Sequence, residues 1–220
     1  SRQRYIIRGF KDIPQKERTS RYEVFLNYIQ ANYHITLGEI DSGLAIYEDI
    51  IKKHRGNKDY DLVIGDVFRF YALELERKDA HNEADCQAVI RYFVESIKCC
   101  SKVKDMRGAY SSALDVAAVY RDTKYEYKKA IELLEELILR AGKSGVASFE
   151  ALLHREISDA YNYMRDFEKA ILHLNIANRK TDMLGISWMR PEIYQNILIT
   201  YLSAGYFVEF RDFYNANKVE

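Results

Sequence analysis

The side chains best suited to hold a metal ion or to act as nucleophiles are five histidines and three cysteines. No two histidines have the His-Glu-x-x-His spacing that places two zinc ligands on one helix face, and no Cys-x-x-Cys pair occurs. His81 and Cys86 lie close in the sequence with Glu83 and Asp85 between them, but a metal site there needs further ligands from elsewhere in the chain. We therefore predict no metal site and no cofactor.

The remaining reactive segments also lack the arrangement of a catalytic site. Cys99 and Cys100 are adjacent at the expected end of a helix, where buried or unreactive thiols are a simpler interpretation than a redox pair. The segment Gly142-Lys143-Ser144-Gly145 lacks the upstream glycine and the strand of a phosphate-binding loop. We assign no catalytic residue and predict that the chain is not an enzyme.

The charge balance and hydropathy argue against two classes of partner. Lys+Arg and Asp+Glu both number 33, whereas nucleic-acid-binding domains usually carry a basic excess. The local basic excess in residues 1–20 is interpreted as a solvated entry segment. No apolar stretch of about 18 residues and no signal peptide is visible. We expect no nucleic-acid binding through this domain, no membrane contact and a cytoplasmic location, which an odd number of cysteines also fits.

Composition and proline placement predict an all-α chain. Of 220 residues, 48% are hydrophobic, which allows a sizeable core. The only prolines are Pro14 and Pro191, so the long interval between them contains no proline to break a helix. Repeated short strands would require more turns rich in glycine and proline.

The elements that must position any functional side chain are pairs of helices repeated along the chain. Phe167, Ala170, Leu174 and Ala177 form one stripe of a helix, and Asp166 precedes them as a cap. The pattern recurs about forty residues earlier and later, as Tyr127, Ala130, Leu134 and Leu137 and as Phe207, Phe210, Tyr214 and Asn217. Each stripe follows another helical stretch, so the repeated unit is a helix, a tight turn and a second helix.

The spacing of these units predicts the domain organisation. About five repeats are expected near residues 21–56, 60–100, 108–142, 147–184 and 188–218. They form one helical-repeat domain over residues 21–220, after the basic segment 1–20. Residues 77–84 are expected to form a long polar loop within the second repeat.

The unit resembles a tetratricopeptide repeat (TPR). Tyr161, Phe167, Ala170, Leu174 and Ala177 match the aromatic and small residues of the family pattern. The period of about forty exceeds the usual length of about 34 residues. Such lengthened repeats resemble those of Gram-positive peptide-pheromone receptors, Rap-type response-regulator phosphatases and some eukaryotic scaffold proteins. The resemblance implies an all-α, α-α superhelix, a TPR-like right-handed solenoid. A generic α-solenoid without kinship to the family is the alternative.

By this resemblance, the first helix of each repeat lines a concave groove, and its residues beside the packing stripe contact the partner. Asn and Gln can donate to and accept from a peptide backbone, and Arg can bind a carboxylate with two hydrogen bonds. For each position, a solvated polar face without a partner is the alternative. The predicted partner-binding residues are Tyr28, Asn32, Arg69, Asp115, Arg155, Asp159, Asn162, Tyr163, Gln195 and Asn196.

These positions favour a protein- or peptide-binding module that acts as an adaptor or scaffold. The carboxylate clamp of chaperone-binding TPR domains is not matched, because Tyr28 stands where that clamp has a lysine and Asp159 would repel a carboxylate. Two alternatives remain. One is a peptide-sensing domain of a bacterial transcription regulator or of a Rap-type phosphatase, and the other is a self-assembling scaffold. The last predicted helix carries Phe207, Phe210, Phe213 and Tyr214 without an evident polar cap, so we expect either that the chain continues or that a homodimer covers this uncapped C-terminal repeat.

Overall fold

The computed structural model describes residues 20–79, 83–144 and 148–217, and every regular element in these ranges is helical. The predicted all-α class is therefore confirmed. The chain divides into two compact units, residues 1–116 and 117–220. Each unit is described by itself below.

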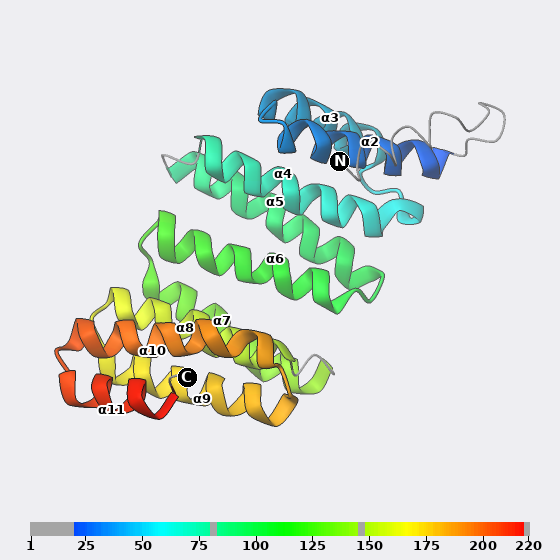
Figure 1. Ribbon diagram of the computed structural model, residues 1–220. Coiled ribbons are helices and arrows are strands. Elements are labelled where there is room, and N and C mark those ends of the chain that lie inside the picture. Colours follow the sequence, from blue (N-terminus) through cyan, green and yellow to red (C-terminus); the bar gives the residue numbers. More distant parts are fainter. Residues whose placement is uncertain (1–19, 80–82, 145–147, 218–220) are drawn as a thin grey trace. The chain divides into compact units, whose positions relative to one another are not determined.

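The first unit consists of helices that pack in consecutive antiparallel pairs (Figure 1). The first pair is α2 (Ser20–Thr36) with α3 (Ile40–His54), and after the short η2 (Lys58–Tyr60) the second pair is α4 (Asp61–Asp79) with α5 (Glu83–Lys102). Helix α6 (Met106–Ala118) follows, and its last two residues belong to the second unit. The prediction of a long polar loop over residues 77–84 is wrong, because α4 continues to Asp79 and α5 begins at Glu83.

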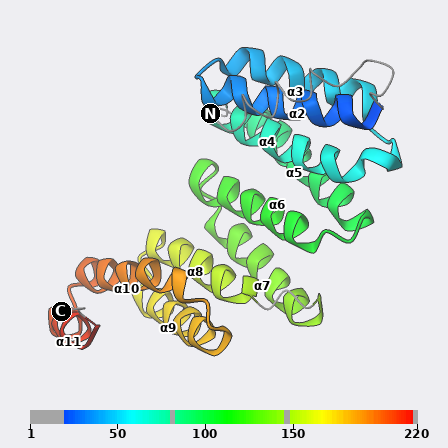
Figure 2. The ribbon, with the colours of Figure 1, turned by 45° about the vertical axis from the view of Figure 1, so that its right-hand side comes forward.

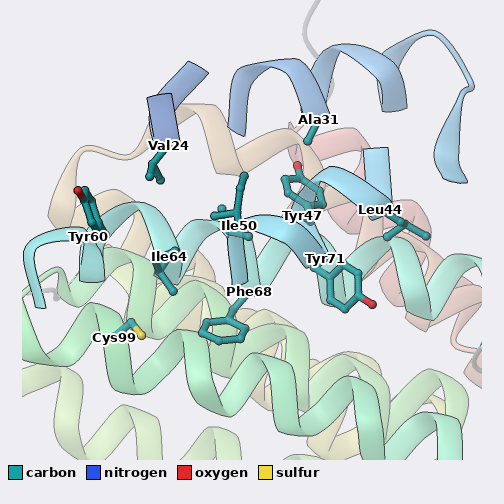
Figure 3. Close-up of a cluster of buried hydrophobic side chains, with 11 residues drawn as sticks. Val24, Ala31, Leu44, Tyr47, Ile50, Tyr60, Ile64, Phe68, Tyr71 and Cys99 are labelled. Atoms are coloured by element: carbon teal, nitrogen blue, oxygen red, sulfur yellow. The ribbon is translucent and has the colours of Figure 1, made fainter. Parts of the chain in front are cut away.

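The core of the first unit lies between the two pairs. The side chains of Tyr47 and Ile50 from α3 and of Ile64 and Phe68 from α4 are almost fully buried in one cluster (Figure 3). These residues follow one another at i, i+3 or i, i+4, which places them on one stripe of each helix. The second pair therefore covers the apolar surface that the first pair cannot bury alone.

Two glycines allow α4, α5 and α6 to approach closely around Cys100. A Cβ atom added at Gly65 would lie 2.8 Å from the Cys100 Sγ, and one added at Gly108 would lie 2.7 Å from it. Burial raises the pKa of the Cys99 and Cys100 thiols to about 11, with a further contribution from Asp61 and from Asp105 respectively. Both side chains are buried packing residues, and at neutral pH they are thiols rather than nucleophilic thiolates.

The second unit continues the alternation of helices. It begins with a π-helical segment, η3 (Val119–Thr123), which extends α6, and with α7 (Tyr127–Ser144). The pair α8 (Ser148–Tyr163) and α9 (Phe167–Leu184) follows, and after η4 (Ser187–Met189) the last pair is α10 (Arg190–Ala204) and α11 (Phe207–Asn217). Helix α9 packs against both α8 and α10 (Figure 2).

The turns of the second unit repeat at intervals of forty residues. Tyr125, Arg165 and Gly205 all have positive φ angles, of 56°, 60° and 77°. After Arg165 and Gly205 the next amide bonds the carbonyl five residues back, from Asp166 to Tyr161 and from Tyr206 to Tyr201. Asp166 also caps α9, since its Oδ1 accepts from the Lys169 amide at 3.3 Å. The turn geometry thus carries the same period as the sequence.

The stripe predicted for α9 is buried. Ala170, Leu174 and Ala177 are each 0% exposed, and Leu174 and Ala177 share a cluster with Ile193 and Ile197 of α10. The small alanines let the neighbouring helices approach α9 closely. The predicted repeat boundaries remain predictions, and residues 1–19 of the predicted basic segment lie outside the described residues.

Candidate functional site: a polar pocket of the second unit

The predicted site residues of the first unit are occupied by contacts within that unit. The Asn32 Nδ2 donates to the Tyr28 carbonyl at 2.9 Å, and its Oδ1 accepts from the Tyr47 hydroxyl at 3.0 Å. The Tyr28 ring lies against Tyr47 and Phe70, and burial together with Asp66 raises its pKa to about 12. These two side chains connect α2 to α3 and α4 in addition to any role in binding.

Arg69 and Asp115 contact each other. The Arg69 Nε lies 2.5 Å from the Asp115 Oδ2, and its guanidinium carbon lies 5.9 Å from the centre of the Phe70 ring. Both side chains are less than one-third exposed. The pair joins α4 to α6 across 46 residues of sequence, so two positions predicted separately form one ion pair.

In the second unit, four of the predicted residues line a single pocket of about 400 Å³. The pocket lies between α8 and α10 and beside the π-helical segment η3. Its walls are Asp159, Asn162 and Tyr163 of α8, Asn196 and Ile199 of α10, and Arg121 of η3. Carboxylate, carboxamide, guanidinium, aromatic and aliphatic groups thus meet in one concave site.

Arg121 is held in the pocket wall by bonds to two other carboxylates. Its Nε and Nη2 each donate to Asp122 at 2.7 Å, and its Nη1 donates to the Glu156 Oε2 at 2.5 Å. Burial lowers the pKa of Arg121, but the bonds to Asp122 and Glu156 raise it above its ordinary value. The guanidinium is therefore a permanent cation that is already bonded to two partners.

Asp159 makes only long contacts with the neighbouring guanidinium groups. Its Oδ2 lies 3.3 Å from the Arg155 Nη1 and 3.8 Å from the Arg121 Nη1, whereas hydrogen bonds between charged groups usually measure about 2.7–2.9 Å. Burial and, to a smaller extent, the nearby Glu156 raise the Asp159 pKa to about 6, because Arg155 and Arg121 offset only part of their effect. Asp159 is therefore an ionised but incompletely compensated carboxylate at neutral pH.

The hydrogen bonds around Thr200 fix the orientation of Asn162. The Thr200 hydroxyl donates to the Asn196 carbonyl at 2.7 Å, so its single proton is already used. It must then accept from Asn162, whose Nδ2 lies 2.9 Å away. The buried Asn162 Oδ1 has no hydrogen-bond partner among the described residues. The pocket wall thus carries an acceptor that is removed from solvent without a donor.

The other predicted residues of the second unit, Arg155 and Gln195, do not line this pocket. Arg155 pairs with Asp159, with Glu156 and, at 3.1 Å, with Glu192 of α10, so it connects α8 to α10. Gln195 lines a second groove, between α10 and α11. Tyr163 is 60% exposed and stacks on Tyr127, with ring centres 5.6 Å apart and planes inclined by 6°.

Arg121 is the charged residue of the pocket that the sequence analysis did not select. It follows the last packing residues of α6, where a regular α-helix gives no reason to expect a side chain that faces α8. The π-helical segment is the cause, since a π turn is wider than an α turn and changes the direction of the side chains it carries. The adjacent Arg121-Asp122 pair before the turn was the only signal in the sequence.

Comparisons with known proteins give a fold but no close relative. No protein-family model matches the chain, and no curated protein matches it. A structure of the apo form of RapI superposes with a TM-score of 0.61 over 98% of this chain, at 14% identity. A protein from Podosopora anserina, described as a kinesin light chain with nearly identical TPR-like repeats, superposes with a TM-score of 0.63 over 88% of this chain and 92% of its own, at 12% identity. The chain has a TPR-like helical-repeat fold.

The TPR-like fold agrees with the predicted fold class, and the forty-residue interval of its turns agrees with the predicted lengthened repeat. The chain spans 60% of the length of the RapI chain. A complex of the yeast Sti1 TPR2AB domain is also similar, at 15% identity over 97% of this chain and 82% of that chain, with a TM-score of 0.36.

Two further properties follow from the described part of the TPR-like chain. Its helices do not include one with the length and apolar character needed to cross a bilayer. Nor do the described ranges contain three or more His, Cys, Asp or Glu side chains gathered as ligands for a metal ion.

Proposed function

We propose that this TPR-like chain is a protein-interaction module, an adaptor or scaffold that binds a segment of another protein at the pocket of η3, α8 and α10. The observation that supports this proposal most directly is the pocket itself. It gathers an unpaired amide oxygen, an incompletely compensated carboxylate and an exposed tyrosine from α8, and Asn196 and Ile199 of α10 complete its lining.

These groups are suited to a peptide rather than to a reaction. Carboxamides bind the donors and acceptors of an extended backbone, and tyrosine supplies contact area with little loss of side-chain entropy. A non-catalytic role and a cytoplasmic location are parts of the proposal. The three cysteines are buried and form no disulfide bond with one another, which fits a reducing compartment.

The test compares two tyrosines that have similar surroundings but lie in different grooves. Tyr163 lines the pocket of η3, α8 and α10, is 60% exposed and stacks on Tyr127. Tyr214 lines the groove of α10 and α11, is 51% exposed and stacks on Phe210 with the same 6° inclination. Partners captured by the wild-type chain are identified by mass spectrometry, and the affinity of each purified partner is measured for wild type, Tyr163→Ala and Tyr214→Ala.

We expect Tyr163→Ala to weaken binding by about tenfold or more, because truncation of a central aromatic residue at an interface commonly costs more than about 1 kcal/mol. Tyr214→Ala should leave the affinity near that of wild type. Equal affinities for all three chains, or a loss confined to Tyr214→Ala, would contradict the assignment of the pocket.

A second candidate is a peptide-sensing regulatory domain of a transcription regulator or of a Rap-type phosphatase. The structural similarity to RapI covers 98% of this chain but 60% of the longer RapI chain. This similarity favours the second candidate. It requires an effector segment outside residues 1–220. Reading the full coding sequence tests this candidate, and a coding sequence that encodes no DNA-binding or phosphatase segment beside this domain would exclude it.

A third candidate is self-assembly through the groove of α10 and α11. Its wall residues Pro191, Tyr214 and Asn217 lie forty residues after Ala151, Leu174 and Ala177, and are therefore their equivalents in the next repeat. Ala151, Leu174 and Ala177 are buried in a cluster with residues of α10. The groove is therefore the equivalent of a surface that a helix pair normally buries. We propose a second copy of the chain as its occupant, since a twofold axis places the same apolar patch on itself.

A further inference from the structure

The ion pairs around the pocket of η3, α8 and α10 leave an excess of negative charge. Two guanidinium groups, of Arg121 and Arg155, contact four carboxylates in one connected network. These carboxylates belong to Asp122, Glu156, Asp159 and Glu192. The carboxylates therefore outnumber the guanidinium groups by two, so the network attracts a further cation.

The excess charge is directed into the pocket through Asp159. The shortest bonds of Arg121 go to Asp122 and Glu156, and those of Arg155 go to Glu156 and Glu192. Asp159 receives only the two longer contacts, and it is the one carboxylate of the four that lines the pocket. A donor that enters the pocket thus finds a carboxylate that the intramolecular cations have not neutralised.

Asn162 presents a second acceptor to the same donor. Its amide nitrogen is committed to Thr200, which leaves its buried Oδ1 without a donor among the described residues. Asp159 and Asn162 are three residues apart on α8, so their side chains project from neighbouring turns of the same helix face. A group that carries several N–H donors and a positive charge satisfies both acceptors.

The remaining walls suit the aliphatic stem of such a group. Ile199 is 50% exposed and supplies an apolar wall, and Tyr163 supplies an aromatic face that attracts a cation. Lysine and arginine both combine a long aliphatic stem with a charged donor group. A carboxylate ligand would instead meet Asp159 and the excess negative charge.

We propose that the pocket binds a basic side chain, arginine or lysine, of the partner peptide, with Asp159 and the Asn162 Oδ1 as its acceptors. This inference rests on the proposed function, since it names the chemistry of the segment that the module binds. It also excludes a C-terminal carboxylate as the group that enters this pocket.

The test uses short blocked peptides in which only the central side chain can carry a charge, together with one peptide whose only cation is its N-terminal amine. The probes are acetyl-Ala-Ala-Xaa-Ala-Ala-amide with Xaa as Arg, Lys, citrulline or Glu, and the citrulline peptide with a free N-terminus. Citrulline keeps the shape of arginine without its charge, and the free amine tests the other source of a cation. Binding to the intact chain is followed by NMR through the side-chain amide resonances of Asn162 and Asn196.

We expect the Arg and Lys peptides to bind with a Kd at least about tenfold lower than that of the blocked citrulline peptide, since a hydrogen bond to a carboxylate is stronger when its donor is charged. Asp159→Asn should remove this preference. Asp212→Asn, which changes an exposed aspartate paired with Arg211 on α11, should keep it. The preference should also decrease as the salt concentration rises.

The other outcomes separate this inference from the proposed function. Equal binding of the Arg, citrulline and Glu peptides would overturn the inference, while a peptide-binding pocket would remain. If only the free-amine peptide binds, the pocket recognises an N-terminal amine rather than a basic side chain, and the inference is overturned. If no peptide perturbs Asn162 or Asn196, the inference is overturned, and the proposed function is decided by the affinities of the Tyr163 and Tyr214 variants.

Discussion

Asn162 and Arg155 each have two roles, because both connect α8 to α10, while Asn162 also lines the pocket and Arg155 also contacts Asp159 in the pocket wall. Asn162 donates to Thr200, and Arg155 pairs with Glu192. Replacing either residue by alanine would therefore disturb the packing of the helices together with any contact to a partner. Tyr163 and Asp159 are more informative positions, since Tyr163 is exposed and Asp159 has only long contacts within the chain.

Asp159 is expected to reduce the stability of the folded chain at neutral pH. Its folded pKa of about 6 lies above the ordinary value near 3.8, so between these values the folded state binds more protons than the unfolded state. The free energy of unfolding should therefore decrease as pH rises from 4 to 6. Asp159→Asn should raise the free energy of unfolding at pH 7 by about 1–3 kcal/mol and flatten this part of the pH profile. Urea denaturation at several pH values measures both effects, and a destabilised variant would contradict the argument.

The paired histidines of α8 and α9 should have the opposite effect on the pH dependence of stability. The His154 Nδ1 lies 3.0 Å from the His173 Nδ1. Burial, followed by His173 and Lys180, lowers the His154 pKa to about 4, against an opposing effect of Glu150. Burial also lowers the pKa of His173. The unfolded state therefore binds more protons below pH 6.5, and the stability that neutral His154 provides is lost as pH falls towards 4.

This loss should be visible by comparison with His154→Phe, which keeps a ring and removes the titration. As pH falls from 7 to 4, the stability of wild type should decrease relative to the variant by about 1–2 kcal/mol, a value discounted for the partial exposure of the site. Denaturant midpoints measured in parallel provide the comparison. Parallel pH profiles would show that His154 does not titrate in this range.

At the scale of elements, the turns and the π-helical segment decide where the pocket residues lie. The turns at Tyr125, Arg165 and Gly205 recur every forty residues, and they fix the phase between the first and second helix of each pair. The turn after η3 differs from the other two, because the Glu126 amide bonds the Tyr120 carbonyl six residues back instead of five. The same irregular segment carries Arg121 into the pocket wall.

The equivalent turn residues Arg165 and Gly205 allow a matched test of backbone strain. A residue with a side chain is disfavoured at positive φ, whereas glycine is not. Arg165→Gly should therefore raise the free energy of unfolding by about 0.5–1 kcal/mol, and Gly205→Ala should lower it by about 1 kcal/mol. A Cβ atom at Gly205 meets no atom within 4 Å. A loss of stability in Gly205→Ala would therefore result from the strained backbone conformation rather than from a steric clash. Thermal unfolding of the two variants measures the effects, and changes of the same sign would contradict the argument.

At the scale of the whole molecule, the groove of α10 and α11 is the feature that self-assembly would use. Its wall residues Leu198, Ile199 and Leu202 take the places of Ser158, Asp159 and Asn162 under a displacement of forty residues. The last repeat therefore presents apolar side chains where the preceding repeat presents polar ones. Leu202 and Tyr214 are about half exposed there, at 47% and 51%.

If a second copy covers this groove, the wild-type chain should have the mass of a dimer by light scattering at high concentration. Leu202→Glu places a charge in the groove and should shift the mass to that of the monomer, because an unpaired charge is costly to bury. Leu172→Glu on α9 is the control, since Leu172 is similarly exposed, at 53%, and does not line the groove. A wild-type chain that stays monomeric would remove this candidate.

The sequence by itself determined the helices, the forty-residue period and the buried stripes of α7 and α9, whereas no residue of the stripe predicted for α11 is buried. These features depend on local properties: the 3.6-residue periodicity of apolar side chains, the caps and the turn residues. The buried Ala170, Leu174 and Ala177 follow from that periodicity. The local pattern was less informative near residues 77–84, because residues 77–79 belong to α4 and residues 83–84 belong to α5 although most of them are polar.

Only the tertiary structure decided how the polar positions divide between internal bonds and an open pocket. The sequence does not show that Asn32 is bonded to Tyr47, that Arg69 is paired with Asp115, or that Arg121 joins Asp159 and Asn162 in one wall. The physical reason is that each of these contacts joins side chains of different helices, as between Arg121 and Glu156, 35 residues apart. The direction of each side chain, and hence the charge and open acceptors of the pocket, is set by the packing of one repeat on the next.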